Sequence, residues 1–367
     1  MPSKNKRVKI FFLVIFILII LTYLLTCLIP FLNPGTFWFI AILGLGFPFL
    51  LALVIVCTII AAIKKSKWVF LSLAALLLSY QQISVVFGFR NTKEFDMLKP
   101  DNSLRVMSWN VSRWTQGETQ IGKDKGSSFR NLMMDAVQMT DADVLCFQEF
   151  FESFDASVFA SNIGPLKKMG YNYFFFSPIS ITGNGVFQTG LIILSKYPII
   201  DSAYFKTISE GHSEGFSYAS VKYGNQTIRF FNTHLESMGI SRTAYGEILP
   251  TETSRTIVSK IKRSYYFRSQ QTDKLAEEMK RSLYPIVFFF FFDDVPNSYT
   301  YFKIKGDMQD AFLKKGFGFG RSYQFISPTL RIDYMMTDKK FKVEQFSTLD
   351  YKYSEHYPQV MDISFPK

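Results

Sequence analysis

The chain has 367 residues, of which 48% are hydrophobic and 17% aromatic, and its formal net charge is +11. This apolar content excludes a disordered chain, and the lack of a short repeat excludes a fibrous or solenoid architecture. Residues 1–102 carry ten Lys or Arg but only three Asp or Glu. Most of the basic excess therefore flanks apolar segments, which is weak evidence for a nucleic-acid-binding patch on the rest of the chain.

Three long apolar segments open the chain, at about 10–32, 37–63 and 68–89. Each has the ~20 apolar residues that a helix needs to cross a bilayer. We therefore predict three transmembrane helices and an integral protein of the inner or plasma membrane. The alternative, a cleaved signal peptide over the first segment, is disfavoured because the segment exceeds the roughly 7–15 apolar residues of such a peptide.

Basic residues around these segments predict an orientation. Four of them precede the first segment, and three more lie between the second and third, at Lys64, Lys65 and Lys67. The connection at 33–36 has no charge. The positive-inside rule then places the N-terminus and the 64–67 loop in the cytoplasm. Three crossings leave the remainder of the chain in the periplasm or outside the cell.

A polar linker at 90–102 is expected to join the membrane region to a domain at 103–367. Alternating or fully apolar runs in this domain predict strands, and helical spacing predicts two long helices. The expected strands are 104–110, 144–147, 191–194, 217–223, 227–232, 285–292, 331–335 and 359–363, and the expected helices are 128–139 and 254–283. This mixture of hairpins and helical crossovers predicts an α/β sandwich of two packed sheets.

Polar residues gather at the ends of these strands, where a sheet commonly presents functional groups. They lie in six short segments that read, in order, SWNV, DVLCFQE, NTHLE, DDVPNS, RIDY and SEH. Each of these residues alone has an ordinary structural explanation, but six such segments in this order are much harder to obtain by chance than any one of them. The candidates are Asn110, Glu149, Asn232, His234, Asp293, Asp333, Glu355 and His356.

This order of motifs resembles the endonuclease/exonuclease/phosphatase superfamily, which includes deoxyribonucleases, abasic-site endonucleases, inositol polyphosphate 5-phosphatases and bacterial sphingomyelinases. The resemblance covers roughly residues 103–367. It implies a four-layer α/β/β/α sandwich and divalent-metal-dependent phosphoester hydrolysis. The expected cofactor is Mg²⁺, with Mn²⁺ as the alternative ion.

The resemblance also implies a role for each candidate. Glu149 would be the principal metal ligand, and Asn110 and Glu355 would contribute further metal contacts. Asn110 and Asn232 would contact the substrate phosphate, and His234 would hydrogen-bond a phosphate oxygen. Asp333 would orient His356, which would stabilise the pentacovalent phosphate or exchange protons with the leaving group.

Two departures from the family pattern affect this interpretation. The fourth motif usually reads Gly-Asp-Phe-Asn-Asp, but here Phe291 replaces the Asp that activates water, and Asp293 replaces the Asn. The last motif reads Ser354-Glu355-His356, where the family has Ser-Asp-His. Three interpretations of Phe291 stay open: a weakly active or inactive member, water activation by Asp293, or an altered form of an active parent sequence. The alternative function is a degenerate scaffold that binds a phosphorylated ligand or partner.

The sequence leaves the substrate open among nucleic acid, a lipid head group and a small phosphoester. Membrane anchoring favours contact with membrane lipid, and no protein partner is indicated. The stretch 255–281 has eight Lys or Arg against three Asp or Glu. This stretch is either a solvated helix face or a patch for anionic phosphate groups.

Overall fold

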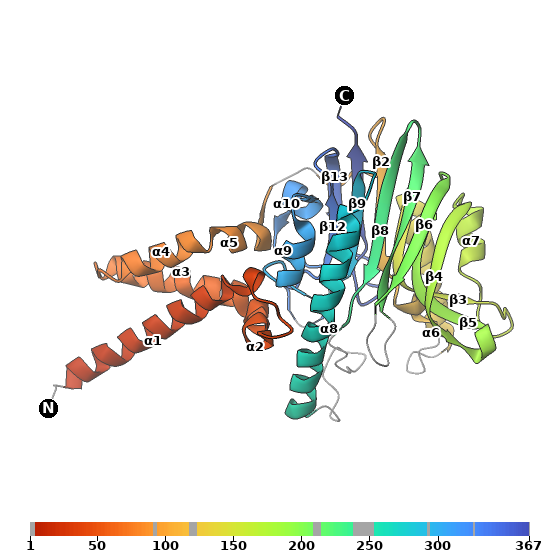
Figure 1. The fold of residues 1–367 in the computed structure, drawn as a ribbon. Coiled ribbons are helices and arrows are strands. Elements are labelled where there is room, and N and C mark those ends of the chain that lie inside the picture. The colour runs from red at the N-terminus through yellow and green to blue at the C-terminus, as the bar shows by residue number, and fades with distance from the viewer. Residues whose placement is uncertain are drawn as a thin grey trace.

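Two six-stranded mixed sheets form the centre of the molecule in a computed structural model (Figure 1). The model describes residues 4–90, 94–116, 123–207, 214–237, 253–291, 294–325 and 327–366. In order across the first sheet, the strands are β13 (Lys342–Thr348), β14 (Gln359–Ser364), β2 (Leu104–Asn110), β3 (Val144–Ser153), β5 (Phe187–Ser195) and β4 (Tyr173–Thr182). The second sheet runs β10 (Gln309–Asp310), β12 (Asp333–Thr337), β9 (Ile286–Phe291), β8 (Gln226–His234), β7 (Gly215–Tyr223) and β6 (Ile199–Lys206).

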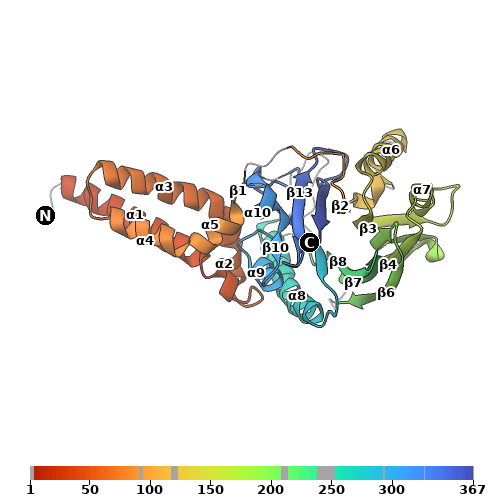
Figure 2. The ribbon, with the colours of Figure 1, turned by 90° about the horizontal axis from the view of Figure 1, so that it is seen from above.

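Helices cover the outer face of each sheet, which completes the expected four-layer α/β/β/α sandwich. The first sheet is covered by α6 (Lys123–Thr140) and α7 (Ile163–Lys168). The second is covered by α8 (Ser254–Lys280) and α9 (Tyr299–Lys305), and α10 (Ala311–Lys315) packs at the edge of the sandwich against β12 and β13. Seen from above, these two helical layers lie on opposite sides of the paired sheets (Figure 2).

The alternation of side chains along the strands explains why both sheets are so apolar. Val106 and Val144 belong to the cluster between the sheets, whereas Met107 and Leu145 pack outward toward α6 and α7. Val287 and Phe289 likewise face the other sheet, and Phe288 packs toward α8 and α9. The Phe-rich strand is therefore covered on both faces, as continuous apolar strands usually are.

The N-terminal region consists of apolar helices that project from the sandwich (Figures 1 and 2). They are α1 (Lys4–Thr26), η1 (Ile29–Phe31), α2 (Trp38–Ala41), η2 (Ile42–Gly46), α3 (Phe47–Ile63), α4 (Val69–Leu78) and α5 (Tyr80–Val86). Lys6–Phe31 and Trp38–Ile63 are each long and apolar enough to cross a membrane. The third expected span is a pair of helices, α4 and α5, bent by 62° at Ser79.

The helical region packs directly onto the sandwich. Arg331, which is buried just before β12, donates from Nη2 to the carbonyl of Val85 at 2.7 Å. Its Nη1 pairs with Asp310 at 2.7 Å. Strand β1 (Gly88–Phe89) pairs with β11 (Phe317–Gly318). These contacts fix the end of α5 against the strand that carries Asp333.

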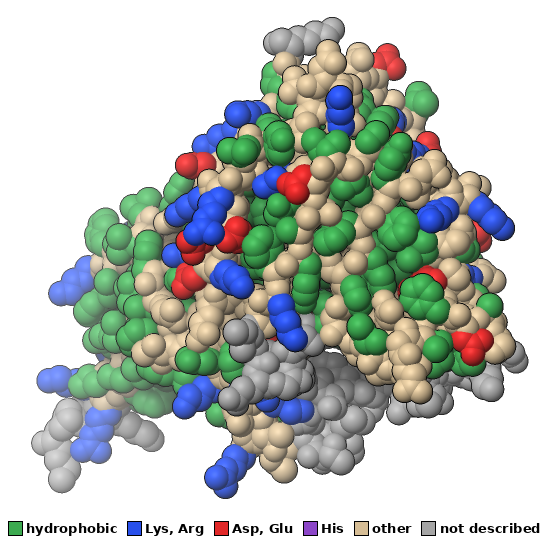
Figure 3. Space-filling view, turned by 45° about the vertical axis from the view of Figure 1, so that its right-hand side comes forward, with side chains coloured by type: hydrophobic (Ala, Val, Ile, Leu, Met, Phe, Trp, Pro, Cys, Tyr) green, Lys and Arg blue, Asp and Glu red, His purple; other side chains and the backbone are tan. Residues whose placement is uncertain are grey.

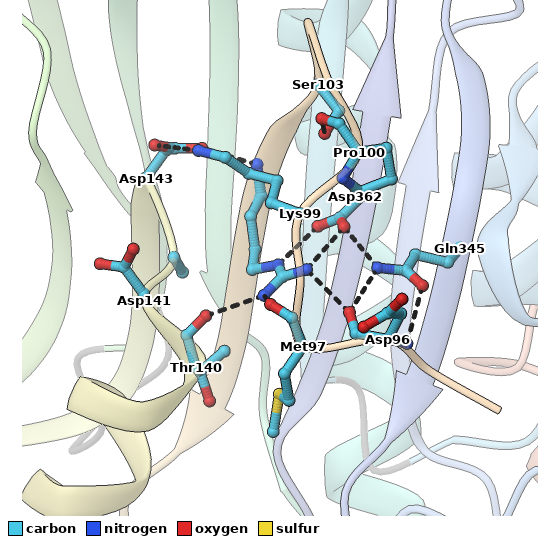
Figure 4. Close-up of polar contacts among 12 residues, drawn as sticks. Asp96, Met97, Lys99, Pro100, Ser103, Thr140, Asp141, Asp143, Gln345 and Asp362 are labelled. Carbon is cyan, nitrogen blue, oxygen red and sulfur yellow. Dashed lines mark hydrogen bonds and ion pairs between the residues drawn. The ribbon is translucent and has the colours of Figure 1, made fainter.

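The expected linker lies against the domain through a polar network around Arg105 (Figure 4). The guanidinium of Arg105 pairs with both carboxylate oxygens of Asp362 at 2.8 Å. It also donates to the carbonyls of Asp96 and Met97 at 3.0 and 2.6 Å. Nearby, Lys99 pairs with Asp143 at 2.7 Å. The network joins the linker to β2 and β14 in the first sheet.

Replacing Asp362 with alanine is expected to lower the free energy of unfolding by about 3–5 kcal/mol, because Arg105 would remain buried without its anion. Urea unfolding of the full chain in detergent, followed by tryptophan fluorescence, measures the change. Asp350→Ala is the matched control, since Asp350 forms an exposed pair with Lys352 at 3.6 Å. A loss no larger than that of the control would contradict a structural role for the Arg105–Asp362 pair.

Candidate active site

The structure brings the candidate residues together at one edge of the paired sheets. Asn110 and Glu149 lie at the ends of neighbouring parallel segments, because Asn110 pairs with Gln148 in the ladder between β2 and β3. His234 ends β8, and Asp333 begins β12 in the other sheet. Two neighbouring loops complete the group. The loop between β13 and β14 carries His356, and the loop before β12 carries Tyr323, which forms a backbone bridge with His356.

Glu149 occupies a bulge in β3. The pairing register with β5 shifts between Phe147 and Phe150, and Glu149 has a positive φ of 49°. A left-handed conformation is unfavourable for a residue with a side chain and is typical of functional positions. Its effect here is that the Glu149 side chain stays 36% exposed while its neighbours along the strand are buried.

Asn110 orients the Glu149 carboxylate. Its Nδ2 donates to Glu149 Oε1 at 2.8 Å, and its Oδ1 accepts from the backbone nitrogen of Ser112 at 3.0 Å. The turn that follows, η3 (Ser112–Thr115), is left-handed, and Trp114 within it packs edge-on against Phe147 and Phe150. The turn thereby connects the amide of Asn110 to the hydrophobic core beneath the site.

His234 lies between two carboxylates. Its Nδ1 hydrogen-bonds Glu214 Oε2, and its Nε2 lies 3.4 Å from Glu149 Oε1. Burial alone would lower the pKa of His234, but Glu214 and Glu149 raise it well above its ordinary value. The two carboxylates therefore favour the protonated imidazole, which can donate a hydrogen bond to an anion.

The same group of charges keeps Glu149 ionised. Burial would raise the pKa of Glu149, but hydrogen bonds from His234 and Asn110, together with nearby His356, lower it to about 2. Glu149 thus carries its negative charge throughout the neutral range, as a ligand for a hard divalent cation must.

A second histidine–carboxylate pair lies beside the first. His356 Nδ1 and Asp333 Oδ2 are 3.0 Å apart, and both residues are buried. The Tyr323 ring packs against the His356 ring with centroids 4.8 Å apart. Tyr323 also donates to Glu355 Oε2 at 3.1 Å, which places the exposed Glu355 carboxylate on the rim next to His356.

Asn232 joins the two sheets. Its Nδ2 donates to the carbonyls of Phe147 and Ile192 at 2.9 and 3.0 Å, and its Oδ1 accepts from Gln148 Nε2 at 2.7 Å. The side chain is fully buried, so the geometry favours a role in fixing His234 relative to Glu149 over direct phosphate contact.

The fourth motif passes through the centre of the site. In the backbone ladders Phe291 pairs with His234 on β8 and with Asp333 on β12. Asp293, the candidate for water activation, lies outside the described residues. Asp294 follows it and is buried against Arg268, with Nη1 and Oδ2 3.5 Å apart. Burial raises the pKa of Asp294, and Arg268 opposes that increase.

Glu214 is a site residue that sequence reasoning missed. The strands predicted at 217–223 and 227–232 form a hairpin in which Tyr223 pairs with Gln226. Extending that register along β7 pairs Gly215 with His234 and brings Glu214 next to the histidine. The register of the predicted hairpin, extended to residue 214, would therefore have placed Glu214 beside His234.

The residues present suit a magnesium-like ion that keeps most of its water. Within the described ranges, no group of three or more His, Cys, Asp or Glu is arranged to hold a metal. Magnesium is commonly held by only one or two carboxylates, with water and substrate phosphate as the other ligands. Glu149, ionised and oriented by Asn110, offers one such carboxylate on the surface of the site.

The N-terminal apolar helices pack on the side of this site that faces away from Glu355 and solvent, beneath Tyr323. Leu45 in η2 packs in one apolar cluster with Val295, Tyr323, Leu330 and Ile332. Gly44 lies close to the loop after β9 as well, since a Cβ there would be 3.4 Å from the Val295 side chain and 3.6 Å from that of Asn297. The first part of the second candidate span, Trp38–Ile63, therefore packs in one cluster with the loop after β9 and with the tyrosine that stacks on His356.

Comparisons with solved structures agree with this fold. The human Nocturnin catalytic domain is 15% identical, with a TM-score of 0.53 over 73% of this chain and 97% of that one. A mannosyl-6-phosphatase of Bacteroides thetaiotaomicron is 17% identical, with a TM-score of 0.51 over 71% of this chain and 100% of its own. An endonuclease/exonuclease/phosphatase from Beutenbergia cavernae is 17% identical, with a TM-score of 0.51 over 72% of each chain.

These likenesses confirm the endonuclease/exonuclease/phosphatase fold for the sandwich. Residues 8–86 match a separate family, described as Domain of unknown function (DUF8431). In sequence the chain matches no curated protein. The apolar helices and the sandwich are thus recognised separately, although the structure packs them together.

Proposed function

We propose that this protein is a membrane-anchored, metal-dependent phosphoester hydrolase whose active site faces away from the cytoplasm. One observation carries the proposal. In a fold shared with phosphoesterases, Asn110–Glu149, Glu214–His234 and Asp333–His356 meet at one sheet edge. Such an arrangement supplies an anionic metal ligand, a cationic hydrogen-bond donor and a carboxylate-oriented histidine, which are the groups that phosphoester cleavage requires.

Each side chain has a defined task in this proposal. Glu149 holds the divalent cation, which when bound would neutralise charge on the phosphate oxygens. Charged His234 donates a hydrogen bond to a non-bridging phosphate oxygen. Asp333 fixes the tautomer of His356 through Nδ1, so that Nε2 exchanges a proton with the oxygen entering or leaving the phosphorus. Asp293 is the candidate that orients the attacking water.

Hydrolysis of bis-p-nitrophenyl phosphate and p-nitrophenyl phosphate by the full chain in detergent tests the proposal. We expect release of p-nitrophenol with Mg²⁺ or Mn²⁺ and at least a ~100-fold lower rate with excess chelator, because the metal is the principal source of charge neutralisation. The ratio of the two rates separates diester from monoester preference. Turnover that is unaffected by the chelator would contradict the metal-dependent mechanism.

The outward orientation is tested with fusions to the C-terminus. The proposal counts α4 and α5 as one crossing, which gives three crossings and puts the sandwich opposite the cytoplasmic N-terminus. An alkaline phosphatase fusion should be active and a green fluorescent protein fusion dark in a bacterial host. The reverse pattern would mean that α4 and α5 re-enter without crossing, and the site would face the cytoplasm.

A binding function is the second candidate, and the position of Phe291 favours it. The residue stands in the ladder between His234 and Asp333, at the position where the family places its water-activating carboxylate. A chain that keeps the phosphate-binding groups without that carboxylate could hold a phosphorylated ligand without cleaving it. The Phe291→Asp experiment in the Discussion distinguishes the two functions.

A further inference from the structure

Helix α8 packs against the N-terminal helices where the two candidate spans are joined. Its stripe Ile257, Ile261 and Tyr265 packs in one cluster with Trp38, Ala41 and Ile42, at the start of the second candidate span. The turn that precedes this segment touches the helix as well. A Cβ on Gly35 would lie 3.1 Å from Ser269 Oγ and 3.4 Å from Tyr266 Cα. The N-terminal half of α8 is therefore held at the level where the two spans meet.

A second stripe on α8 has the composition of a membrane–water interface. One residue further along a helix is rotated by about 100°, so positions 258, 262 and 266 flank the stripe that packs on Trp38. They are Val258, Lys262 and Tyr266, and Val258 and Tyr266 are 44% and 50% exposed. Arg255 lies on the same side of the helix. Apolar, aromatic and basic residues in this mixture are typical of helices that lie in the head-group region.

Exposed aromatic residues surround the turn that joins the two candidate spans. Phe31, Phe37 and Phe39 are exposed around the turn at 33–36. Aromatic side chains are enriched at the level of lipid head groups, where they anchor spanning helices. The end of α8 that carries Arg255 projects below the sheets in Figure 1, and Lys and Arg side chains emerge at this end of the molecule in Figure 3.

We propose that Arg255, Val258, Lys262 and Tyr266 of α8 form a surface that seats on anionic phospholipid head groups. The proposal rests on the membrane anchoring proposed above. Two observations favour a lipid surface as the occupant: the stripe adjoins the turn between the two candidate spans, where Gly35 lies against Tyr266, and its two charges are both positive. The apolar and aromatic side chains would enter the interface, and the two cations would pair with lipid phosphates.

This contact has a consequence for the active site. The segment that α8 packs against also carries Leu45, which lies under Tyr323 and thus behind His356. A head-group contact on α8 would therefore hold the active site close to the membrane surface, within reach of phosphoesters that are attached to lipid.

Fluorescence quenching by brominated lipids tests the proposal in the full chain reconstituted into vesicles. A background with Cys27, Cys57 and Cys146 replaced by alanine receives one labelled cysteine at a time. We expect labels at Val258→Cys and Tyr266→Cys to be quenched by lipids brominated near the head group. A label at Lys280→Cys, at the other end of α8, serves as the exposed control and should be quenched at least twofold less. A label at Leu53→Cys, on the second span, reports whether the chain is in the bilayer.

The preference for anionic lipid is measured by comparing two brominated lipids. In vesicles containing equal fractions of each class, brominated phosphatidylglycerol should quench the Val258→Cys label at least twofold more than brominated phosphatidylcholine. The Arg255→Gln/Lys262→Gln variant should lose that difference, because each cation near the surface contributes a several-fold attraction. Lys280→Gln/Lys339→Gln removes two exposed cations elsewhere and should keep it.

Each remaining outcome would overturn the proposal in a recognisable way. Equal quenching of the labels at 258, 266 and 280, with Leu53→Cys quenched, would mean that α8 stands clear of an otherwise correctly placed bilayer. Equal quenching by the two lipid classes would exclude an anionic head group as the ligand. An unquenched Leu53→Cys label would remove the membrane anchoring itself, and with it both this surface and the membrane part of the proposed function.

Discussion

Replacing Glu149 with glutamine is expected to lower metal-dependent phosphoester hydrolysis at least ~100-fold, since the substitution removes the one ionised carboxylate that Asn110 orients in the site. Glutamine keeps the length of the side chain and adopts the same backbone conformation, so the bulge in β3 should persist. The charge is what changes. With a pKa of about 2, Glu149 is fully ionised at neutral pH, and glutamine at that position is neutral.

The rate with saturating Mg²⁺ and the Mg²⁺ concentration at half-maximal rate are the quantities to measure. A loss of metal affinity should raise the Mg²⁺ concentration at half-maximal rate before it lowers the rate at saturating Mg²⁺. Glu344→Gln is the matched control, because Glu344 pairs with Lys342 on the surface of β13 at 2.7 Å. Unchanged turnover and metal dependence in Glu149→Gln would mean that the cation, if one is used, binds elsewhere.

The fold was largely predictable because its strands are regular in their burial. Alternation in β2 indicates a strand with one apolar face, and the continuous apolar character of β9 indicates a strand packed on two sides. Both are strands in the structure, and β2 is buried along its whole length, its polar side chains included. β4, β6 and β13 were missed, as was the two-residue strand β10. These are the edge strands of the two sheets, and the side chains of β4, β6 and β13 are mostly half-buried or exposed. An edge strand has a weaker hydrophobic pattern, so sequence periodicity alone does not reveal it.

The candidate site was predictable only as a set of strand-end motifs. The order of the motifs brought Asn110, Glu149, His234, Asp333 and His356 to attention, and the structure places them around one sheet edge. It assigns Asn232 to a buried contact between the sheets. That distinction depends on which side of the sheet edge is open to solvent, and a motif does not carry this information.

Contacts between the membrane region and the sandwich had no sequence signal. Leu45 and Tyr323 are far apart in the chain, and neither belongs to a recognisable motif. Apolar residues in a spanning segment are expected to face lipid or one another. Nothing in their order indicates that one of them packs in the cluster behind His356, so this part of the site required the three-dimensional structure.

Restoring the family pattern with Phe291→Asp/Asp293→Asn is expected to raise the rate of phosphoester hydrolysis by ~10²–10⁴-fold, the usual contribution of a positioned general base. The physical reason is the place of residue 291 in the sheet. Its backbone pairs with His234 on one side and Asp333 on the other. A carboxylate at that position would join the charged imidazole and the Asp333–His356 pair at the point where an attacking water must be oriented.

Phe291→Leu distinguishes the effect of adding a carboxylate from the effect of removing the aromatic ring, because it removes the ring without adding charge. This variant should show no gain, and thermal unfolding should confirm that both variants are folded. A large gain confined to Phe291→Asp/Asp293→Asn would mean that the native chain retains an intact scaffold in which only water activation is weak. The groups that bind metal and phosphate would then be functional already.

The other outcomes distinguish the remaining interpretations of the motif. If the native chain is active and the double variant is slower, Asp293 supplies the base, and Asp293→Ala should then abolish turnover. If neither chain turns over substrate while both bind a non-hydrolysable phosphodiester, measured by calorimetry, the site is a binding site. In that case the Glu214–His234 pair, with its retained positive charge, would account for the affinity, and His234→Gln should weaken binding because it removes that charge.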